Sequence, residues 1–183
     1  MRPSIRSTVF IVLLGVCQTL HAQPRWQVES ASVVFEITNA GLPVHGSFAG
    51  LEADLRFDPD DPEHSVVFAT VDASTVDTGI GLRNRHLRKR DYFHVDLHPC
   101  IRMESVRIEK QGSETFSGTF LLDIKGIQRE VTFPFTFTPR GQGGRLVGDF
   151  TINRLDFGLG KSSVILADDV TVHLAVEVSE MEP

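Results

Sequence analysis

Apolar and polar side chains alternate with a period of two along most of the chain from residue 31 to residue 179. This spacing is typical of β-strands that bury one face, because successive side chains of a strand point to opposite sides. Short polar turns, such as those at 58–62, 125–126 and 141–144, separate the alternating runs. The pattern predicts about eight strands, around positions 33–37, 51–57, 67–73, 101–108, 116–124, 131–137, 146–152 and 170–178.

Three irregularities modify this pattern. The alternation shifts near Ser105, which predicts a β-bulge in the fourth strand. Pro134 removes a hydrogen-bond donor from the sixth strand and predicts an edge position or a local break. Residues 80–90 lose the alternation and gain basic and amide side chains, so we expect a short helix between strands three and four, lying at one end of the sheet.

A single antiparallel sheet with one apolar face must bury that face. It can do so by closing into a barrel or by folding into a sandwich. The fold class is therefore all-β, and the strand count suits an eight-stranded barrel whose interior is just wide enough for side chains or for one small ligand.

The first 22 residues have the features of a secretory signal peptide. Arg2 and Arg6 form a positive start, an apolar stretch covers 9–16, and Ala22 supplies a small residue before the expected cleavage site. The apolar stretch is too short to span a bilayer as a stable helix. We therefore predict export to the periplasm.

Cleavage after Ala22 would leave one domain, residues 23–183. Anchoring as a lipoprotein through Cys17 is less favoured, because the bulky Val16 precedes it where a small residue is needed. Only Cys100 would remain in the mature chain, so we expect no internal disulfide.

The chain is acidic, with 24 Asp and Glu against 18 Lys and Arg and a formal net charge of −6. This charge disfavours nucleic acid and anionic membrane surfaces as electrostatic partners. We expect no integral membrane segment after the signal, because no later apolar stretch is long enough. The sequence leaves the oligomeric state open, a homodimer included.

The aromatic residues are 13 Phe with one Trp and one Tyr. Phe has no polar atom that needs a partner, and most of these rings fall on or beside inward positions. Gly46, Gly118 and Gly148 share that inward parity. Large rings mixed with glycines can fill a barrel completely or leave space for a guest, and periodicity alone does not separate these two alternatives.

A series of motifs in the middle of the chain is more specific. It reads Ser-Thr-Val-Asp-Thr at 74–78, Arg-Asn-Arg-His-Leu-Arg at 83–88, Asp-Tyr-Phe-His-Val at 91–95 and Pro-Cys-Ile at 99–101. Further matching segments lie at 44–48, 118–120, 125–127 and 153–158. This series closely resembles the YceI-like family, and the resemblance covers essentially all of residues 26–179.

The resemblance implies an exported, lipocalin-like, eight-stranded antiparallel barrel that binds polyisoprenoids and related lipids in a hydrophobic tunnel, without a catalytic centre or a cofactor. We predict that inward apolar side chains form the tunnel wall. They are Phe35, Phe48, Phe93, Ile101, Met103, Phe120, Leu122, Phe133, Phe135 and Phe150.

The local basic segment offers candidates for contact with a lipid headgroup. Arg83, His86 and Arg88 could meet a phosphate or a quinone oxygen at the barrel mouth, since guanidinium groups match such acceptors. A solvated helix face, with one of these side chains bound to Asp91 or to a strand carbonyl, is the alternative.

Metal and catalytic chemistry are less favoured. His94 and His98 are four residues apart, but the following proline indicates an extended segment, so the spacing does not suit a metal. The acidic turn at 58–63 lacks the order of an EF-hand. Ser74, His86 and Asp91 supply triad residue types without a nucleophile elbow.

We therefore expect a non-enzymatic carrier or store of an apolar lipid, such as a polyprenyl chain or an isoprenoid quinone. A barrel filled by its own side chains, acting in stress response or protein interaction, is the first alternative. An isomerase or hydrolase that uses His86 is the second.

Overall fold

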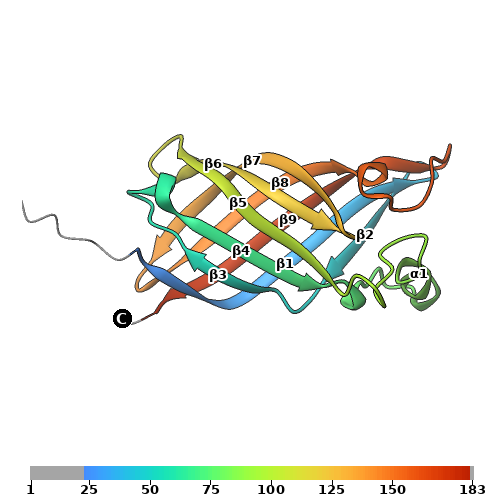
Figure 1. Ribbon diagram of the computed structural model, residues 1–183, viewed down its shortest axis with the longest axis horizontal. Coiled ribbons are helices and arrows are strands. Elements are labelled where there is room, and N and C mark those ends of the chain that lie inside the picture. Colours follow the sequence, from blue (N-terminus) through green and yellow to red (C-terminus); the bar gives the residue numbers. More distant parts are fainter. Residues whose placement is uncertain (1–22, 182–183) are drawn as a thin grey trace, which may run out of the picture.

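The computed structural model describes residues 23–181. The predicted signal peptide therefore lies outside the described residues. The strands are β1 (Arg25–Asn39), β2 (Leu42–Phe48), β3 (Glu52–Arg56), β4 (Val66–Asp72), β5 (Cys100–Lys110), β6 (Thr115–Ile124), β7 (Ile127–Arg140), β8 (Gly143–Asn153) and β9 (Leu166–Glu180). The helix α1 (Gly81–Leu87) lies between β4 and β5, and short 3-10 turns occupy Pro62–His64, Ala73–Thr75 and Arg154–Phe157. All neighbouring strands run antiparallel (Figure 1).

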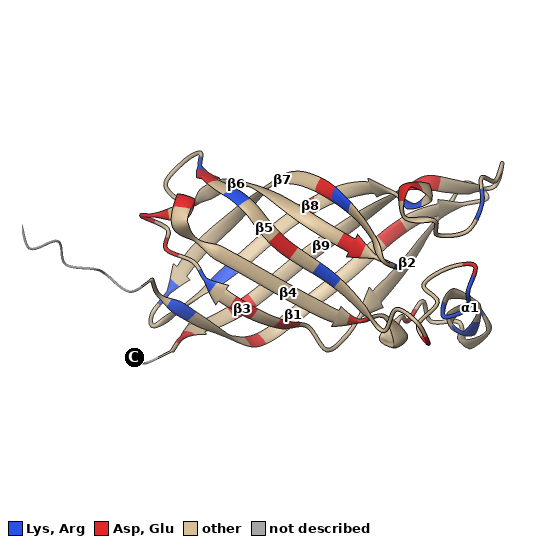
Figure 2. Ribbon diagram, in the orientation of Figure 1, with Lys and Arg blue, Asp and Glu red and all other residues tan. Residues whose placement is uncertain are grey.

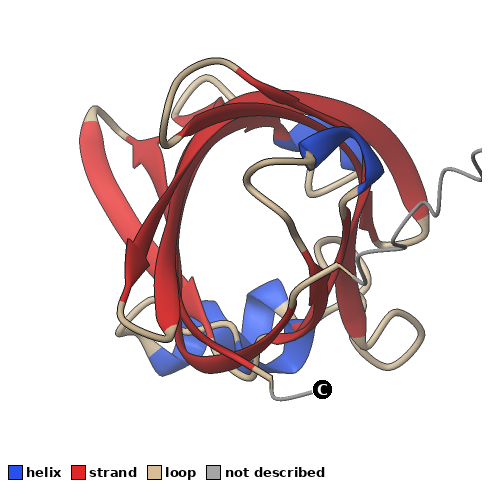
Figure 3. Ribbon diagram, turned by 90° about the vertical axis from the view of Figure 1, so that its left-hand side faces the viewer, coloured by secondary structure: helices blue, strands red, loops and turns tan. Residues whose placement is uncertain are grey.

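β1 closes the sheet into a barrel. One edge of β1 pairs with β9 along nearly its whole length, from Trp26 opposite Glu180 to Asn39 opposite Leu166. The other edge pairs with β2 near its end and with β3 at its start, so β2 and β3 act as two halves of one interrupted strand. The prediction of an eight-stranded antiparallel barrel with a short helix between strands three and four is confirmed, and Figure 3 shows the closed ring of strands.

Both predicted irregularities of the strands are present. The register between β5 and β6 shifts between Ser105 and Arg107, which leaves Val106 exposed as the bulged residue. Pro134 pairs with Ser117 of β6, whereas the pairing of β7 with β8 begins only at Phe135. Pro134 thus marks a local break between two strands and not an edge of the sheet.

The half of the barrel nearest the described chain ends is solid. Phe57 of the loop after β3 packs against Phe116 and Phe137, with ring centroids 5.1 and 5.3 Å apart. Trp26 covers Phe137 at 5.1 Å, and Phe116 stacks on Phe135 at 5.5 Å. Because these four Phe rings are buried and contact one another, this half matches the filled-core alternative.

Glycines let the Phe rings lie flat against the barrel wall. A Cβ at Gly118 would overlap the ring of Phe120, and one at Gly46 would overlap the ring of Phe35. Gly46 lies directly opposite Phe35 in the β1–β2 ladder. The inward glycines therefore accommodate neighbouring aromatic rings, and they do not by themselves create the free space inside the barrel.

Candidate functional site: an apolar cavity at one end of the barrel

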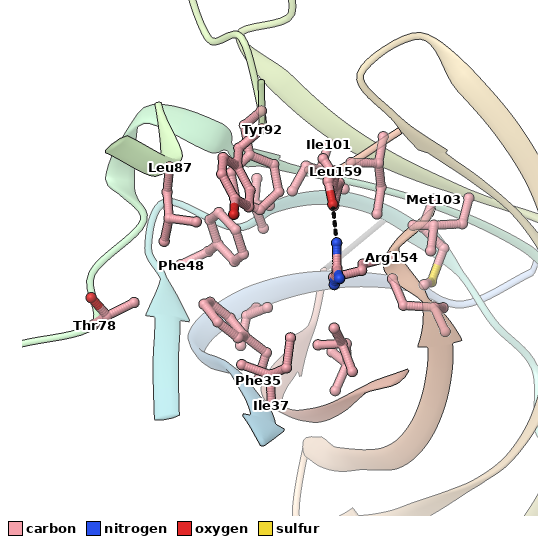
Figure 4. Close-up of a pocket in the computed structure, with 18 of the residues that line it drawn as sticks. Phe35, Ile37, Phe48, Thr78, Leu87, Tyr92, Ile101, Met103, Arg154 and Leu159 are labelled. Atoms are coloured by element: carbon pink, nitrogen blue, oxygen red, sulfur yellow. Dashed lines mark hydrogen bonds between the residues drawn. The ribbon is translucent and has the colours of Figure 1, made fainter. Parts of the chain in front are cut away.

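The half of the barrel nearest α1 is hollow. It holds a cavity of about 320 Å³ whose lining is almost entirely apolar (Figure 4). On β1 the lining runs from Val33 to Asn39, and on β9 from Leu166 to Leu174. These two stretches pair with each other at the same end of the barrel, so the cavity is confined to that end. Its volume lies at the lower end of the range for ligand pockets, about 300–1,000 Å³.

Seven of the ten predicted wall residues line this cavity. They are Phe35, Phe48, Phe93, Ile101, Met103, Leu122 and Phe150. Phe48 contacts Phe35 and Phe93 with ring centroids 5.5 and 5.4 Å apart, so aromatic rings from β1, β2 and the segment after α1 form one side of the mouth. Ile37, Leu87 and Leu159 complete the apolar rim.

Phe120, Phe133 and Phe135 are inward, as predicted, but they do not line the cavity. Phe133 stacks on Phe150 at 4.6 Å and on Phe120 at 4.9 Å, and Phe120 lies 6.3 Å from Phe135. These rings form a floor that connects the cavity to the solid half. The inward parity of a residue fixes the side of the sheet on which it lies, whereas its height along the barrel axis decides whether it meets free space.

Helix α1 is fixed beside the mouth through the segment that precedes it. The backbone of Asp77 exchanges two hydrogen bonds with Ser47 of β2, at 2.8 and 3.0 Å. The Asp77 carboxylate accepts from the backbone N–H of Gly79 at 2.9 Å and from Nδ2 of Asn84 at 2.7 Å. These two donors, that of Gly79 first, hold the pKa of Asp77 below its usual range. Because Asn84 belongs to α1, this carboxylate attaches the helix to the edge of β2.

The predicted headgroup residues divide into two kinds. Arg83 lines the cavity, but its Nε donates to Oγ1 of Thr78 at 2.7 Å and its Nη2 to the carbonyl of Thr78 at 2.6 Å. Arg88 does not line the cavity, and its Nη2 donates to the carbonyl of Val76 at 3.3 Å. Both guanidinium groups therefore stabilise the loop around α1, as in the structural alternative for this basic segment, but through Thr78 and Val76 and not through Asp91 or a strand carbonyl.

The side chain of His86 is accessible to a ligand in the cavity mouth. It is exposed, lines the cavity mouth, and lies with its ring centroid 5.0 Å from that of Tyr92. His86 and Tyr92 also line an adjoining open depression with mixed polar and apolar walls, to which Asn39, Asp91 and Lys161 contribute polar groups. The depression supplies hydrogen-bond donors and acceptors next to an apolar cavity, an arrangement that suits the polar end of an amphiphile.

Arg154 is the most deeply buried cation of the site, with 2% of its surface exposed. Its Nη1 donates to the carbonyl of Leu159 at 2.8 Å (Figure 4). Its Nη2 donates to the carboxylate of Asp168 at 2.7 Å. Further bonds from Arg154 reach the carbonyls of Lys161, Leu166 and Ala167. The loop at 158–165 is thereby folded around one guanidinium beside the cavity. Sequence reasoning assigned no role to Arg154; the available signal was a cation at a strand end, followed by turn residues.

Lys125 fixes the same loop from the β6–β7 turn. Its Nζ donates to the carbonyl of Gly158 at 2.8 Å. Burial lowers the pKa of the Lys125 ammonium, although the nearby Asp91 opposes this effect. Lys125 and Arg154 together hold the loop in place from two sides.

The acidic turn at 58–63, considered above for calcium, serves local structure. The carboxylate of Asp58 accepts from the backbone of Asp60, and that of Asp61 lies 2.7 Å from the His64 ring, so the acidic turn forms its own bonds. Across residues 23–181, no three His, Cys, Asp or Glu side chains gather as a metal site. In that same range, no helix is long and apolar enough to cross a bilayer.

The fold and the cavity define a class of protein: a closed antiparallel β-barrel with an apolar pocket at one end and a solid aromatic core at the other. The family model described as the YceI-like domain matches residues 26–178. The chain therefore belongs to the YceI-like family, as the sequence motifs predict.

Relatives and solved structures agree with this assignment. The UPF0312 protein of Azotobacter vinelandii is 29% identical over 174 residues, which cover 90% of this chain and 91% of the relative. The crystal structure of BcnA from Burkholderia cenocepacia has a TM-score of 0.79 at 25% identity and covers 82% of this chain and 99% of its own. A polyisoprenoid binding domain from Saccharophagus degradans has a TM-score of 0.70 at 13% identity, covering 88% of this chain and 100% of its own, and supports the fold alone.

Proposed function

We propose that this protein is a non-enzymatic, periplasmic carrier or store of a lipid with a long apolar chain, such as a polyprenyl lipid or an isoprenoid quinone. The observation that carries the proposal is the apolar cavity beneath α1, lined by side chains from most strands of the barrel. A polyisoprenoid binding domain shares this fold. The signal-like residues 1–22 support the periplasmic location.

The depth of the cavity sets how much of a chain it can bury. The lining of β1 runs from Val33 to Asn39. At about 3.4 Å per residue and a strand tilt of about 40°, this stretch covers about 15 Å along the barrel axis. An extended alkyl chain advances about 1.25 Å per bond, given single-bond lengths near 1.5 Å, so about a dozen carbons fit above the floor.

The energetic gain is of the right order for reversible binding. Burying a dozen CH₂ groups contributes about 10 kcal/mol at about 0.8 kcal/mol each. Association costs about 4–15 kcal/mol. Short tails should therefore bind poorly, and tails that reach the floor should bind with moderate affinity.

The polar end of the ligand is proposed to lie at the mouth, beside His86, Tyr92 and Lys161. These side chains line the open depression and, within residues 23–181, make no hydrogen bond or ion pair, in contrast to Arg83 and Arg154. Because most of the binding free energy comes from the tail, we expect weak selectivity for the headgroup.

A bulky side chain introduced on the cavity wall tests this proposal, because it removes the space for the lipid tail. Ala69 of β4 lines the cavity, so Ala69→Trp should occupy the space of the tail. Organic extraction and mass spectrometry of the purified protein should recover a lipid from the native chain and little from Ala69→Trp. A fluorescent prenyl probe should likewise bind the native chain at least tenfold more tightly than the variant.

A matched control is Ala175→Trp. Ala175 lies in β9 between the inward-facing residues Leu174 and Val176, so its side chain points away from the interior. This variant should keep native lipid recovery and probe affinity. Absence of both lipid and probe binding in the native chain would refute the proposal and favour a barrel that acts through its surface.

A further inference from the structure

Exposed apolar side chains gather around the mouth of the cavity. Val164 is fully exposed, and Leu82 and Leu42 expose 71% and 68% of their surfaces. Ile80 and Ile165 are also more than half exposed. These residues belong to three segments, which we call the collar: the hairpin tip at 40–42, the helical segment at 80–90 and the loop at 158–165. Figure 1 shows α1 and the loop after β8 at the same end of the barrel.

The collar is held together by bonds between its segments. The backbone N–H of Ala40 donates to the carbonyl of Ile165 at 2.6 Å, and that of Gly160 donates at 2.7 Å to the carbonyl of Asp91, the residue directly after the helical segment. Arg154 folds the loop beneath these contacts. The exposed apolar side chains are therefore presented by ordered segments around the cavity entrance.

The collar is also locally basic. Residues 80–90 include five Lys and Arg and no Asp or Glu, and the basic positions appear on α1 in Figure 2. Within the described part of the chain, the side chains of Arg85, Lys89 and Arg90 make no ion pair or hydrogen bond (those of Arg83 and Arg88 bond to the loop). The nearest preceding carboxylate, that of Asp77, is bonded to Gly79 and Asn84. Asp91 follows Arg90 directly, and its carboxylate also lies near Lys125, so the five cations outnumber the one adjacent carboxylate.

Exposed apolar side chains beside unpaired cations do not stabilise a protein surface that faces only water. At a bilayer surface, apolar groups enter the headgroup region and each Lys or Arg near anionic lipid contributes about 1 kcal/mol. The net charge of −6 repels such a surface from the molecule as a whole, so attraction is confined to the collar and fixes the orientation.

We propose that the collar docks the barrel, mouth first, on the surface of an anionic phospholipid bilayer. The proposal extends the proposed function by assigning the surface from which a tail enters or leaves the cavity. A polyprenyl chain longer than the cavity depth would project through the mouth, and the docked collar would place that remainder in the bilayer.

The test is cosedimentation of the purified protein with vesicles at low ionic strength. Vesicles of equal parts phosphatidylglycerol and phosphatidylcholine should bind the native chain, and pure phosphatidylcholine vesicles should bind it much less. Arg85→Glu with Lys89→Glu should lower the partition coefficient for the mixed vesicles by roughly tenfold or more. Leu82→Ser with Val164→Ser should lower it by roughly tenfold, because two exposed apolar side chains no longer insert.

Matched controls carry the same exchanges away from the collar. Phe68→Ser with Val106→Ser alters exposed apolar residues of the β4–β5 wall, and Arg25→Glu with Arg107→Glu alters exposed cations outside the collar. These controls should keep native vesicle binding. Equal losses in the controls and the collar variants, or a failure of the native chain to bind mixed vesicles, would overturn the proposal. Binding of a protein through the collar without vesicle binding would also overturn it.

Prenyl probe binding in solution separates this inference from the proposed function. The collar variants should keep native affinity for the probe, because their side chains lie outside the apolar lining. Vesicle binding without probe binding would leave the docking surface standing and remove the carrier function; the reverse result would remove only the docking surface.

Discussion

Nη2 of Arg154 lies 2.7 Å from Oδ1 of Asp168, at the buried base of the loop that borders the cavity. The remaining N–H groups of the same guanidinium donate to backbone carbonyls, so one side chain satisfies several acceptors. Arg154→Leu would leave these carbonyls and the carboxylate without their donor. We expect a loss of about 3–5 kcal/mol in the free energy of unfolding, measured by urea denaturation.

Arg145→Leu is the matched control for that change. Arg145 lies in β8, the strand that ends directly before Arg154, and pairs with Glu177 at 3.2 Å, but both side chains are more than one-third exposed. Its loss should cost less than about 1 kcal/mol, because exposed ion pairs contribute little. Similar losses for the two variants would contradict the structural role assigned to Arg154.

Because the Asp77 carboxylate bonds to α1, we expect the attachment of the helix to weaken in acid. The folded-state pKa of Asp77 is lowered by the backbone N–H of Gly79 and the side chain of Asn84. A lowered pKa means that the stabilisation is present above the unfolded value of about 3.9 and is lost as pH falls through the folded value. The protection factor of the Gly79 amide, which corrects for the pH dependence of intrinsic exchange, should therefore fall as pH drops below the folded-state pKa of Asp77.

Asn84→Ala tests the cause of this shift. It removes one of the two donors, so NMR titration of the Asp77 carboxyl carbon should give a pKa closer to the usual value. An unchanged pKa in Asn84→Ala would show that the side-chain bond from α1 does not hold the carboxylate.

Close packing of glycine and Phe predicts a steric cost at Gly118. Gly118→Ala would place a Cβ against the ring of Phe120 and within 3.2 Å of Phe135. Overpacking of this kind costs about 1–3 kcal/mol, measurable as a lower urea midpoint. Gly112→Ala should be close to neutral, because its nearest neighbour would be Thr115 Cβ at 3.7 Å; an equal cost at both positions would rule out the steric explanation.

The sequence predicts the fold well because every second residue of a strand points to the same face, so the apolar residues of the buried face are visible in a short stretch of sequence. The bulge after Ser105 and the break at Pro134 were also visible locally. The sequence did not show where the interior is free and where it is filled. Phe133 and Phe150 have the same inward parity, but they lie at different heights along the barrel axis, and only Phe150 lines the cavity. The role of Arg83 was hidden for a similar reason: its partner Thr78 is close in sequence, but the turn that joins them is set by the pairing of Asp77 with β2.

The stacked rings below the cavity predict a limit on tail length. Phe133 lies beneath Phe150 at 4.6 Å, so Phe133→Ala should extend the cavity towards the solid half. The variant should lose about 3–5 kcal/mol in the free energy of unfolding and should bind longer tails than the native chain does. Phe137→Ala is the control, because it removes an equally buried ring on the far side of Phe57; a shift in preferred tail length there would contradict the proposed floor.

In this account, the half of the barrel nearest α1 is an open apolar cavity that receives a lipid tail. This claim is tested most directly by calorimetric titration of the native protein with prenyl and alkyl alcohols of graded length. Affinity should rise by up to about 0.8 kcal/mol per added carbon and level off near a dozen carbons, where the tail meets the floor. Affinity that is independent of length, or no binding at any length, would contradict the claim.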